Sequence, residues 1–321
     1  MSSFQLSNKS AILVTGAGGF LGKFVVNKLQ EQGFETIYTP TRKDYDLREQ
    51  ADVRLLFQEL KPDAVIHLAA VVGGIGANQN HPGQFCYENL IMGTLLLEEA
   101  RNAGVSKFVT VGTICSYPKF TPVPFREEDL WNGYPEETNA PYGIAKKALL
   151  ALGQGYRAEY DFNAIYLMPV NLYGPGDNFD PHSSHVIPAL IKKCIDAMES
   201  KQVELEIWGD GTPTREFLHA GDAAEAIVLA LKHYNDGEPT NIGSGSEISI
   251  RDLTSMIARL TGFKGNFKFD SSKPNGQPRR ALETSKAKER FGFEAKIDLE
   301  SGLRSTIEWY RSQRPAFAAR D

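Results

Sequence analysis

Residues 14–22 read Val14-Thr-Gly-Ala-Gly-Gly-Phe-Leu-Gly22 and follow directly on an apolar run that begins at Ala11. Three glycines here, Gly16, Gly19 and Gly22, have the spacing G-x-x-G-x-x-G, and helical periodicity follows them. Glycines between a strand and a helix let the backbone turn tightly and approach a pyrophosphate, which rests on the helix N-terminus. The stretch therefore predicts a dinucleotide-binding βα unit. The alternative is a βα turn without a ligand.

The first half of the chain alternates short apolar runs with longer amphipathic stretches. This alternation is typical of βαβ units, so we expect an α/β fold, a Rossmann-type doubly wound parallel sheet with helices on both faces. The expected strands are 11–14, 36–39, 64–67, 108–111 and 164–167, and the expected helices are 20–32, 48–60, 83–103 and 141–160.

The pattern changes after Pro169, where residues 173–185 form a loop rich in Gly, Pro, Asp, Asn and Ser. We expect residues 240–243 to return to the main sheet as a strand. The other expected elements are strands at 204–208 and 267–269 and helices at 187–199, 220–233, 250–260 and 299–312. The expected domains are 1–170, with about 215–245 returning, and a smaller C-terminal α/β substrate-binding domain of about 171–214 and 246–321.

The composition excludes several classes of protein. The net charge of −5 over 321 residues argues against a general nucleic-acid binder, which needs a basic face. Three widely spaced cysteines, Cys86, Cys115 and Cys194, suggest neither a disulfide framework nor a metal site. The first ten residues lack the apolar core of a signal peptide, and the most apolar stretch, 64–77, is too short to span a bilayer. We expect no metal, no membrane segment and a cytoplasmic location.

The end of the second expected strand bears on the choice of cofactor. An acidic residue there would bind the ribose 2′-hydroxyl of NAD, whereas an arginine accommodates the 2′-phosphate of NADP. Arg42 and Lys43 come before any carboxylate in this segment. The segment predicts NADP(H). The alternative is that both are solvated loop cations.

A tyrosine and a lysine stand four residues apart in Pro141-Tyr-Gly-Ile-Ala-Lys146. On a helix this spacing puts Tyr142 and Lys146 on one face. A lysine ammonium together with a cationic nicotinamide would favour the phenolate and lower the pKa of Tyr142. Thr113, just after the fourth expected strand, can hydrogen-bond a substrate oxygen. The set predicts an oxidoreductase; the alternative is an ordinary amphipathic helix.

Four stretches resemble the extended short-chain dehydrogenases/reductases that modify nucleotide-sugars. They are Thr15-Gly-Ala-Gly-Gly-Phe-Leu-Gly22, His67-Leu-Ala-Ala70, Tyr142 with Lys146, and Asn171-Leu-Tyr-Gly-Pro175. Five others are similar to the GDP-L-fucose synthases, a family that takes GDP-4-keto-6-deoxy-mannose, epimerises C3 and C5, and reduces the C4 ketone with NADPH. They are Val72-Gly-Gly-Ile75, Cys115-Ser-Tyr-Pro-Lys119, Asp177-Asn-Phe179, Ser184-His-Val-Ile-Pro-Ala-Leu190 and Gly211-Thr-Pro-Thr-Arg-Glu-Phe-Leu-His219.

The resemblance implies a role for each candidate residue. The C4 ketone acidifies the protons on C3 and C5, and epimerisation needs a base that removes a proton on one face and an acid that returns one on the other. The resemblance implies that Cys115 is the base and His185 the acid. Tyr142 would protonate the C4 oxygen, with Thr113 assisting and Lys146 holding the nicotinamide ribose. The implied cofactor-binding residues are Gly16, Gly18, Gly19, Phe20, Leu21, Gly22, Arg42, Lys43, Leu68, Ala69, Ala70, Val111, Gly112, Tyr142, Lys146, Pro169, Val170, Asn171, Leu172 and His185.

The same resemblance implies that the GDP-sugar meets Lys193, Trp208, Arg215 and Glu283, with Lys273, Arg279 and Arg280 adding positive charge. Simpler roles compete with these. Cys115 and Trp208 could be core residues, His185 a cap of the following helix, and Arg215 a surface ion-pair partner.

Alternatives to the leading function stay open. They are a reductase or epimerase of a related GDP-sugar such as a keto-heptose or another deoxyhexose, an NAD-recycling nucleotide-sugar 4-epimerase, and an NADP-binding regulatory protein without turnover. A dehydratase is disfavoured because Ile114-Cys115 stand where Asp-Glu would be expected. By resemblance, helices 83–103 and 141–160 pair across a two-fold axis in a homodimer.

Overall fold

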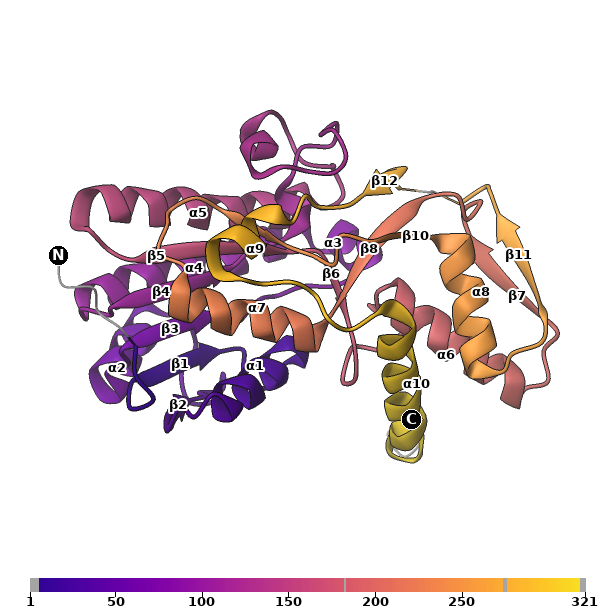
Figure 1. Cartoon of the computed structure of the whole chain (residues 1–321), viewed down its shortest axis with the longest axis horizontal. Helices are drawn as coiled ribbons and strands as arrows, with labels where there is room; N and C mark the ends of the chain where they lie inside the picture. The colour runs from indigo at the N-terminus through magenta and orange to yellow at the C-terminus, as the bar shows by residue number, and fades with distance from the viewer. Residues whose placement is uncertain (1–5, 182, 274–275, 318–321) are drawn as a thin grey trace.

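The computed structural model describes residues 6–181, 183–273 and 276–317. A six-stranded parallel sheet forms its larger part, with strand order β2-β1-β3-β4-β5-β9 (Figure 1). These strands are β2 (Thr36–Tyr38), β1 (Ala11–Thr15), β3 (Ala64–His67), β4 (Lys107–Val111), β5 (Ala164–Pro169) and β9 (Thr240–Ile242).

The central strands are buried on both faces, as parallel strands covered by helices require. Ile12, Leu13 and Val14 in β1 have no exposed surface, and β3 and β4 are buried throughout. Their continuous apolar runs are therefore explained by burial on two sides.

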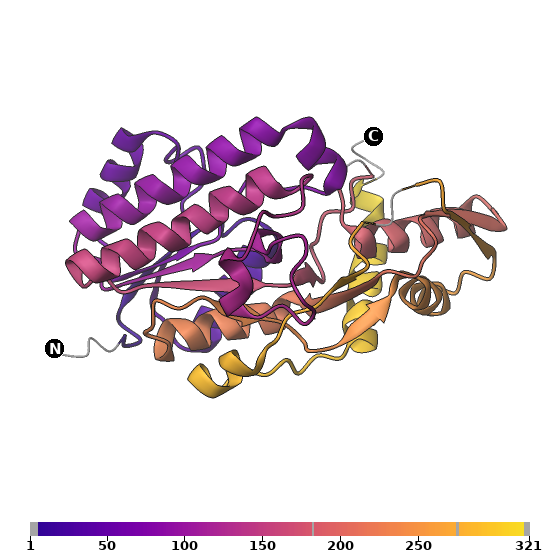
Figure 2. The same ribbon diagram turned by 90° about the horizontal axis from the view of Figure 1, so that it is seen from above.

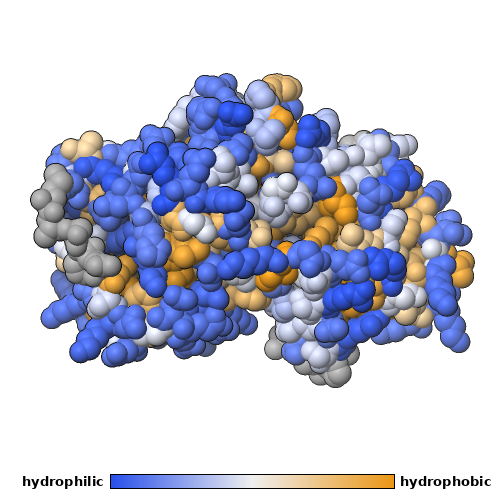
Figure 3. Space-filling view, in the orientation of Figure 1, coloured by the Kyte–Doolittle hydropathy of each residue, from blue (hydrophilic) through white to orange (hydrophobic). Residues whose placement is uncertain are grey.

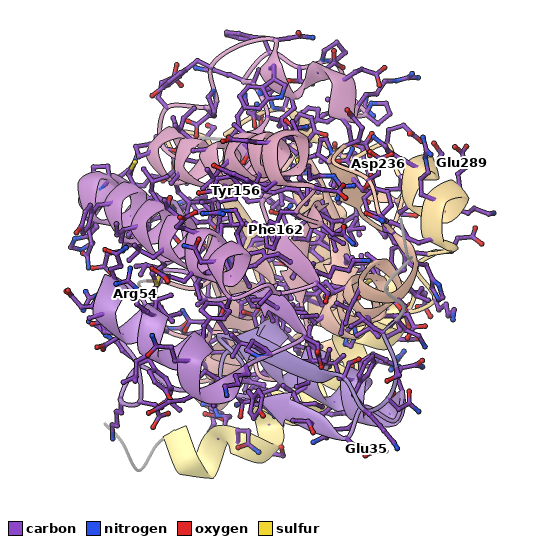
Figure 4. The ribbon with its side chains drawn as sticks, turned by 90° about the vertical axis from the view of Figure 1, so that its left-hand side faces the viewer. Glu35, Arg54, Tyr156, Phe162, Asp236 and Glu289 are labelled. Atoms are coloured by element: carbon purple, nitrogen blue, oxygen red, sulfur yellow. The ribbon has the colours of Figure 1, made fainter. Side chains whose placement is uncertain are left out.

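Helices cover both faces of this sheet (Figure 2). One face carries α1 (Phe20–Glu31) and α7 (Ala220–His233), which contact each other, and the other carries α2 (Gln50–Leu60), α4 (Pro82–Asn102) and α5 (Ala140–Tyr160). Gly93 of α4 lies against Leu149 of α5, and a Cβ at Gly93 would collide with that side chain. Tyr156 of α5 donates a hydrogen bond to Glu98 of α4 at 2.7 Å; Figure 4 shows the two helices side by side at Tyr156.

Chain order in the sheet reverses between β1 and β3, because β2 lies on one side of β1 and β3 on the other. Ligands of doubly wound sheets bind at the carboxyl ends of the strands at such a switch point. The glycine-rich turn follows β1 at this place, so the topology puts it where a dinucleotide is expected.

A smaller part of the molecule has its own hydrophobic core, which includes Ile191, Leu253 and Leu303. It contains α6 (Val186–Glu199), α8 (Ile250–Thr261), α10 (Leu299–Phe317) and the parallel pair β7 (Glu204–Trp208) and β11 (Asn266–Asp270). A third sheet lies between the two parts and has the order β10 (Glu247–Ser249), β8 (Thr214–His219), β12 (Arg279–Arg280), with β6 (Asn171–Tyr173) also paired to β8.

Most expected elements are confirmed with ends shifted by a few residues, and 240–243 does return to the main sheet, where β9 pairs with β5. No strand was expected at 214–219, where the structure has β8, which pairs in the third sheet. The pattern also missed β6, β10, β12 and the helices α3 (Ile75–Asn80) and α9 (Ser285–Phe291). These are short elements that tertiary pairing or packing stabilises. The domain boundaries stay a prediction.

The face drawn in Figure 3 is mostly hydrophilic, with apolar patches near its middle. Across the described residues, none of the helices combines the length and the hydropathy needed to cross a bilayer.

Candidate functional site

The glycine-rich turn lies tightly against the segment that follows β3. Gly16 has a φ of +73°, and a Cβ at this position would come within 2.7 Å of the Ala69 nitrogen. Gly22, in the first turn of α1, faces the Gly16 carbonyl so closely that a Cβ would collide with it. Two of the three glycines are thus required by close backbone approach.

The outer side of the same turn is open and suits a pyrophosphate. Gly18 is exposed, and a Cβ there would meet no atom within 4 Å. Gly19 precedes α1 and provides no side-chain cap, and no side chain among the described residues accepts a hydrogen bond from the N–H groups of the first turn. An uncapped helix N-terminus behind an open glycine is the arrangement that binds the phosphates of a dinucleotide.

Beneath the turn, two buried side chains join β1 to β3. The Thr15 hydroxyl lies 2.9 Å from Nδ1 of His67 and also accepts a hydrogen bond from the Ala69 nitrogen at 3.3 Å. Burial, and then the charge of Lys146, holds the pKa of His67 well below its usual value. Thr15 and His67 were not among the predicted site residues, although both lie in stretches that carried the resemblance.

The two NADP-selecting candidates lie on the loop after β2 and are exposed. The nearby carboxylate of Asp44 accepts hydrogen bonds from the nitrogen and hydroxyl of Thr41 at 2.7 and 2.8 Å. Asp46 lies 3.8 Å from Nε of Arg42 but is bound mainly by Arg48. Arg42 and Lys43 therefore keep solvent-facing cationic ends suited to a 2′-phosphate.

Tyr142 and Lys146 lie in the first turns of α5, where Pro141 occupies an early position that needs no amide hydrogen. Both side chains are enclosed, with 7% and 2% of their surface exposed. Burial lowers the pKa of Lys146 to about 8. Within the described residues, Nζ of Lys146 donates no hydrogen bond, which leaves it available to a ligand hydroxyl.

The expected lowering of the Tyr142 pKa involves a cationic nicotinamide as well as Lys146 and stays a prediction for the complex; the pKa in the protein by itself lies above its usual value. Burial raises the pKa of Tyr142, and the charge of Cys115 raises it further. The physical reason is that the phenol is removed from water while the Lys146 ammonium makes no hydrogen bond to it. A neutral phenol suits proton donation rather than proton removal.

The chain after β4 brings Thr113 and Cys115 to the start of α5. A short 3-10 helix, η1 (Ile114–Ser116), follows Thr113, whose hydroxyl accepts a hydrogen bond from the Cys115 nitrogen at 3.2 Å. Gly143 of α5 packs on the Cys115 carbonyl so closely that a Cβ would collide with it, and the Ser116 hydroxyl donates to the Gly143 carbonyl at 3.0 Å. Thr113, Cys115 and Tyr142 are therefore neighbours in one site.

Cys115 also meets a cation from the far end of the sequence. Nη2 of Arg280 lies 3.5 Å from Sγ of Cys115. Arg280 is opposite Arg215 in the pairing of β12 with β8. Burial, and then the charge of Arg280, lowers the pKa of Arg215 to about 10. The sequence had placed Arg280 only among the C-terminal positive charges.

His185 precedes α6, but its side chain makes no capping hydrogen bond to that helix. The alternative role of His185 as a helix cap is therefore wrong. The side chain is reachable by solvent, although the surrounding protein lowers its pKa. The turn before it is held to the Val72–Ile75 stretch, because the Gly74 nitrogen donates to the Ser183 carbonyl at 3.1 Å. Two motifs of the resemblance thus meet near His185.

Other predicted cofactor residues lie where β4 and β5 end. Val111 and Gly112 end or follow β4, and a Cβ at Gly112 would collide with the Tyr166 hydroxyl. Val170 donates its N–H to Ile242, and the Asn171 side chain donates to the Glu216 carbonyl at 3.0 Å. The remaining predicted residues in these turns are Phe20, Leu21, Leu68, Ala70, Pro169 and Leu172. The structure gathers them at one edge of the sheet.

The predicted sugar-nucleotide residues fall into separate groups. Nζ of Lys193 donates to the Glu206 carbonyl on β7 at 3.1 Å, and Trp208, at the end of β7, is 65% exposed, which rules out a core role. Nζ of Lys273 lies 5.6 Å from the centre of the Trp208 ring. Arg215 lies with Arg280, as described above.

The carboxylate of Glu283 contacts neither the Lys193–Trp208 group nor the Arg215–Arg280 group among the described residues. Both oxygens accept hydrogen bonds from Ser285, at 3.0 Å from its nitrogen and 2.8 Å from its hydroxyl, at the start of α9. Its substrate role stays a prediction, and the local contact indicates a capping role.

Comparison with known proteins gives one consistent picture. A family model described as the NAD dependent epimerase/dehydratase family matches residues 12–243. A GDP-L-fucose synthase of Sinorhizobium fredii is 44% identical over 312 residues, covering 97% of this chain and 98% of that protein. A GDP-L-fucose synthetase structure from Naegleria fowleri bound to NADP has 28% identity and a TM-score of 0.88, covering 97% of each chain. A GDP-6-OMe-4-keto-L-xylo-heptose reductase from C. jejuni has 28% identity and a TM-score of 0.91, covering 97% of this chain and all of that one.

Proposed function

Because this chain belongs to the NAD dependent epimerase/dehydratase family, among its GDP-L-fucose synthases, we propose that it converts GDP-4-keto-6-deoxy-mannose to GDP-L-fucose. The reaction comprises epimerisation at C3 and C5 and reduction of the C4 ketone. The observation that carries the proposal is the shared site of Cys115, Thr113 and Tyr142, because it unites a carbon base with a keto-reducing hydroxyl pair.

The enzyme uses NADP(H). The open glycine turn and the uncapped N-terminus of α1 fit its pyrophosphate, and the exposed Arg42 and Lys43 fit its 2′-phosphate. The ammonium of Lys146, which has no hydrogen-bond acceptor among the described residues, would hold the nicotinamide ribose. When bound, NADPH supplies the hydride that C4 accepts.

Epimerisation uses two groups of opposite function. Cys115 removes a proton from the carbon beside the ketone, and His185 returns a proton to the opposite face. The ketone stabilises the charge that develops on its oxygen. Thr113 donates a hydrogen bond to that oxygen from the end of β4.

Reduction uses Tyr142 as the proton donor. Its buried phenol is neutral near pH 7, because its pKa is raised above the usual value of 10.0. Tyr142 gives its proton to the C4 oxygen as that carbon is reduced, and the charge of Lys146 stabilises the phenolate left behind. Arg215, Lys193 and Trp208 bind the GDP part, with the cations on the diphosphate.

The test is incubation with GDP-4-keto-6-deoxy-mannose in deuterated water, with and without NADPH. We expect NADPH oxidation, measured by absorbance, and deuterium at both C3 and C5, measured by mass spectrometry and NMR. NADPH oxidation without deuterium would reduce the function to a simple keto-reductase. If neither signal appears, GDP-4-keto-heptoses are the next substrates, given the likeness to the C. jejuni heptose reductase.

We also propose a homodimer formed through α4 and α5. The support is that apolar side chains on these adjacent helices are exposed in the single chain, among them Tyr87 and Leu90 of α4 and Ile144 of α5. Side chains three apart on a helix share a face, so Tyr87 and Leu90 form one patch.

A cytoplasmic location and the two expected domains complete the proposal. The three cysteines are free thiols, which suits a reducing compartment. The separate hydrophobic cores support an NADP-binding domain, 1–170 with about 215–245, and a sugar-nucleotide domain of about 171–214 and 246–321, except that Leu282, Ala287, Phe291 and Phe293 pack in the larger core. Fractionation and limited proteolysis test the two points.

A further inference from the structure

We propose that Arg280 keeps Cys115 in the thiolate form and is a positioning residue for proton removal at C3 and C5; this role rests on the proposed function. The geometry that carries it is the 3.5 Å approach of Nη2 of Arg280 to Sγ of Cys115, across 165 residues of chain. Thiols become thiolates beside arginine or lysine. A guanidinium stays charged at any pH the enzyme meets.

Among the described residues, Arg280 forms no ion pair with a carboxylate. None of the ion pairs formed within the described ranges involves Arg280, and its Nε is buried without a hydrogen-bond partner there. Its neighbour Arg279 differs, since it forms an ion pair with Glu247 at the surface. Arg280 therefore presents its positive charge to Cys115, with Arg215 as the cation on the neighbouring strand.

A buried carboxylate fixes the strand that carries Arg280. Glu216 of β8 accepts hydrogen bonds from the Leu282 nitrogen at 2.7 Å and from the nitrogens of Ser244 and Gly245 at 2.6 and 2.8 Å. Leu282 is two residues beyond Arg280, so its hydrogen bond to Glu216 holds the segment that carries Arg280 against β8. Parallel pairing of Arg280 with Arg215 adds to this restraint, so the guanidinium is held rather than mobile.

Within the part of the chain that the structure describes, Cys115 interacts with a charged group, Arg280, and a titratable group, Tyr142, which come from different elements. Arg280 reaches it from β12, and Tyr142 lies within electrostatic range from α5. The phenol is neutral near pH 7 because its pKa is raised, so Arg280 supplies the charge that favours the thiolate.

The proton balance of the step is complete. The Cys115 thiolate takes the proton from the carbon beside the ketone, and the electron pair of the broken C–H bond moves to the ketone oxygen. Cys115 is then a neutral thiol. His185 gives a proton to the opposite face of that carbon as the electron pair returns, and exchange with solvent restores both groups.

The experiment measures iodoacetamide alkylation of Cys115 against pH in the full-length enzyme without substrate, with peptide mass spectrometry to separate Cys115 from Cys86 and Cys194. We expect Arg280→Gln to move the pH midpoint of Cys115 alkylation upward by about 1–2 units. Arg280→Lys should restore most of the shift, because it restores a cation. Arg279→Gln, which removes a neighbouring surface charge, should leave the midpoint unchanged.

Activity measurements separate this role from the alternatives. With Arg280→Gln we expect deuterium incorporation at C3 and C5 at pH 7 to fall at least tenfold, while GDP affinity by calorimetry changes less than threefold. An unchanged alkylation midpoint in Arg280→Gln overturns the proposal, and tenfold weaker GDP binding with that midpoint unchanged makes Arg280 a diphosphate ligand instead.

Two further measurements decide the role of Arg280 if the variant does not fold or if the enzyme shows no isotope exchange. If Arg280→Gln does not fold, the wild-type midpoint of Cys115 is compared with that of Cys86 in the same protein, and a midpoint for Cys115 that is not lower overturns the proposal. If wild-type enzyme incorporates no deuterium, the proposed function fails, whereas the alkylation midpoints still decide the role of Arg280.

Discussion

Tyr142 is enclosed by protein, and its raised pKa keeps the phenol protonated near neutrality. We predict that Tyr142→Phe lowers the rate of C4 reduction by about 10²–10⁴-fold, because the proton donor is lost. Deuterium incorporation at C3 and C5 should continue, since that step uses Cys115 and His185. Stopped-flow NADPH oxidation and mass spectrometry measure the two rates.

A matched control is Tyr160→Phe, on the exposed end of the same helix. It should leave both rates unchanged. Equal loss of reduction and of isotope exchange in Tyr142→Phe would contradict the separate roles given to Tyr142 and Cys115.

Asp177 is a second buried titratable residue, 8% exposed, whose Oδ1 accepts a hydrogen bond from the Asn178 nitrogen at 2.7 Å. Its other oxygen has no partner within the described residues. Burial raises its pKa from 3.8 to about 7. The folded state therefore holds a proton that the unfolded state releases above pH 4, and this contribution to stability is lost as the pH rises through 7.

We predict that this residue alone makes the wild type less stable at pH 8.5 than at pH 5.5 by about 2 kcal/mol. Asp177→Asn has no such proton to lose. Between pH 5.5 and pH 8.5, the unfolding free energy of the variant should therefore rise relative to that of the wild type by about 2 kcal/mol. Urea unfolding at the two pH values measures it. The same difference at both values would show that Asp177 does not titrate in this range.

At the level of secondary structure, the junction of η1 with α5 depends on one glycine. A Cβ at Gly143 would collide with the Cys115 carbonyl, whereas Gly155, further along α5, has no atom within 4 Å of such a Cβ. We predict that Gly143→Ala destabilises the fold by about 1–3 kcal/mol and lowers isotope exchange, because it displaces Cys115.

Gly155→Ala is the control for helix propensity, and it should stabilise the same helix by about 0.5–1 kcal/mol. Thermal unfolding and isotope exchange of both variants give the comparison. If the two alanines behave alike, the close approach of α5 to Cys115 does not limit the site.

For the molecule as a whole, the exposed apolar residues of α4 and α5 predict a two-fold interface. We predict that Ile144→Glu converts the protein from a dimer to a monomer, because a charge would have to be buried in the interface. Val203→Glu, at an exposed apolar position next to β7, should stay dimeric. Sedimentation equilibrium measures the mass of both; a wild-type monomer, or a dimeric Ile144→Glu, would count against this interface.

The sequence by itself determined the features that depend on local spacing. The glycine-rich turn fixed a strand–turn–helix unit, because its glycines are needed within one turn of chain, and the four-residue separation of Tyr142 and Lys146 placed both on one face of α5. Alternation of apolar runs with amphipathic stretches was enough for the parallel sheet, and even the return of β9 could be anticipated.

The tertiary structure alone decided which distant groups meet and how they titrate. It put Arg280 against Cys115, joined Thr15 to His67, gave Glu283 a contact with Ser285, and raised the pKa of Tyr142 by burying it. Strands such as β6 and β12, with three and two residues, are too short to show a pattern of their own. Contact and desolvation depend on the packing of segments far apart in the chain, and no local pattern of residues encodes that packing.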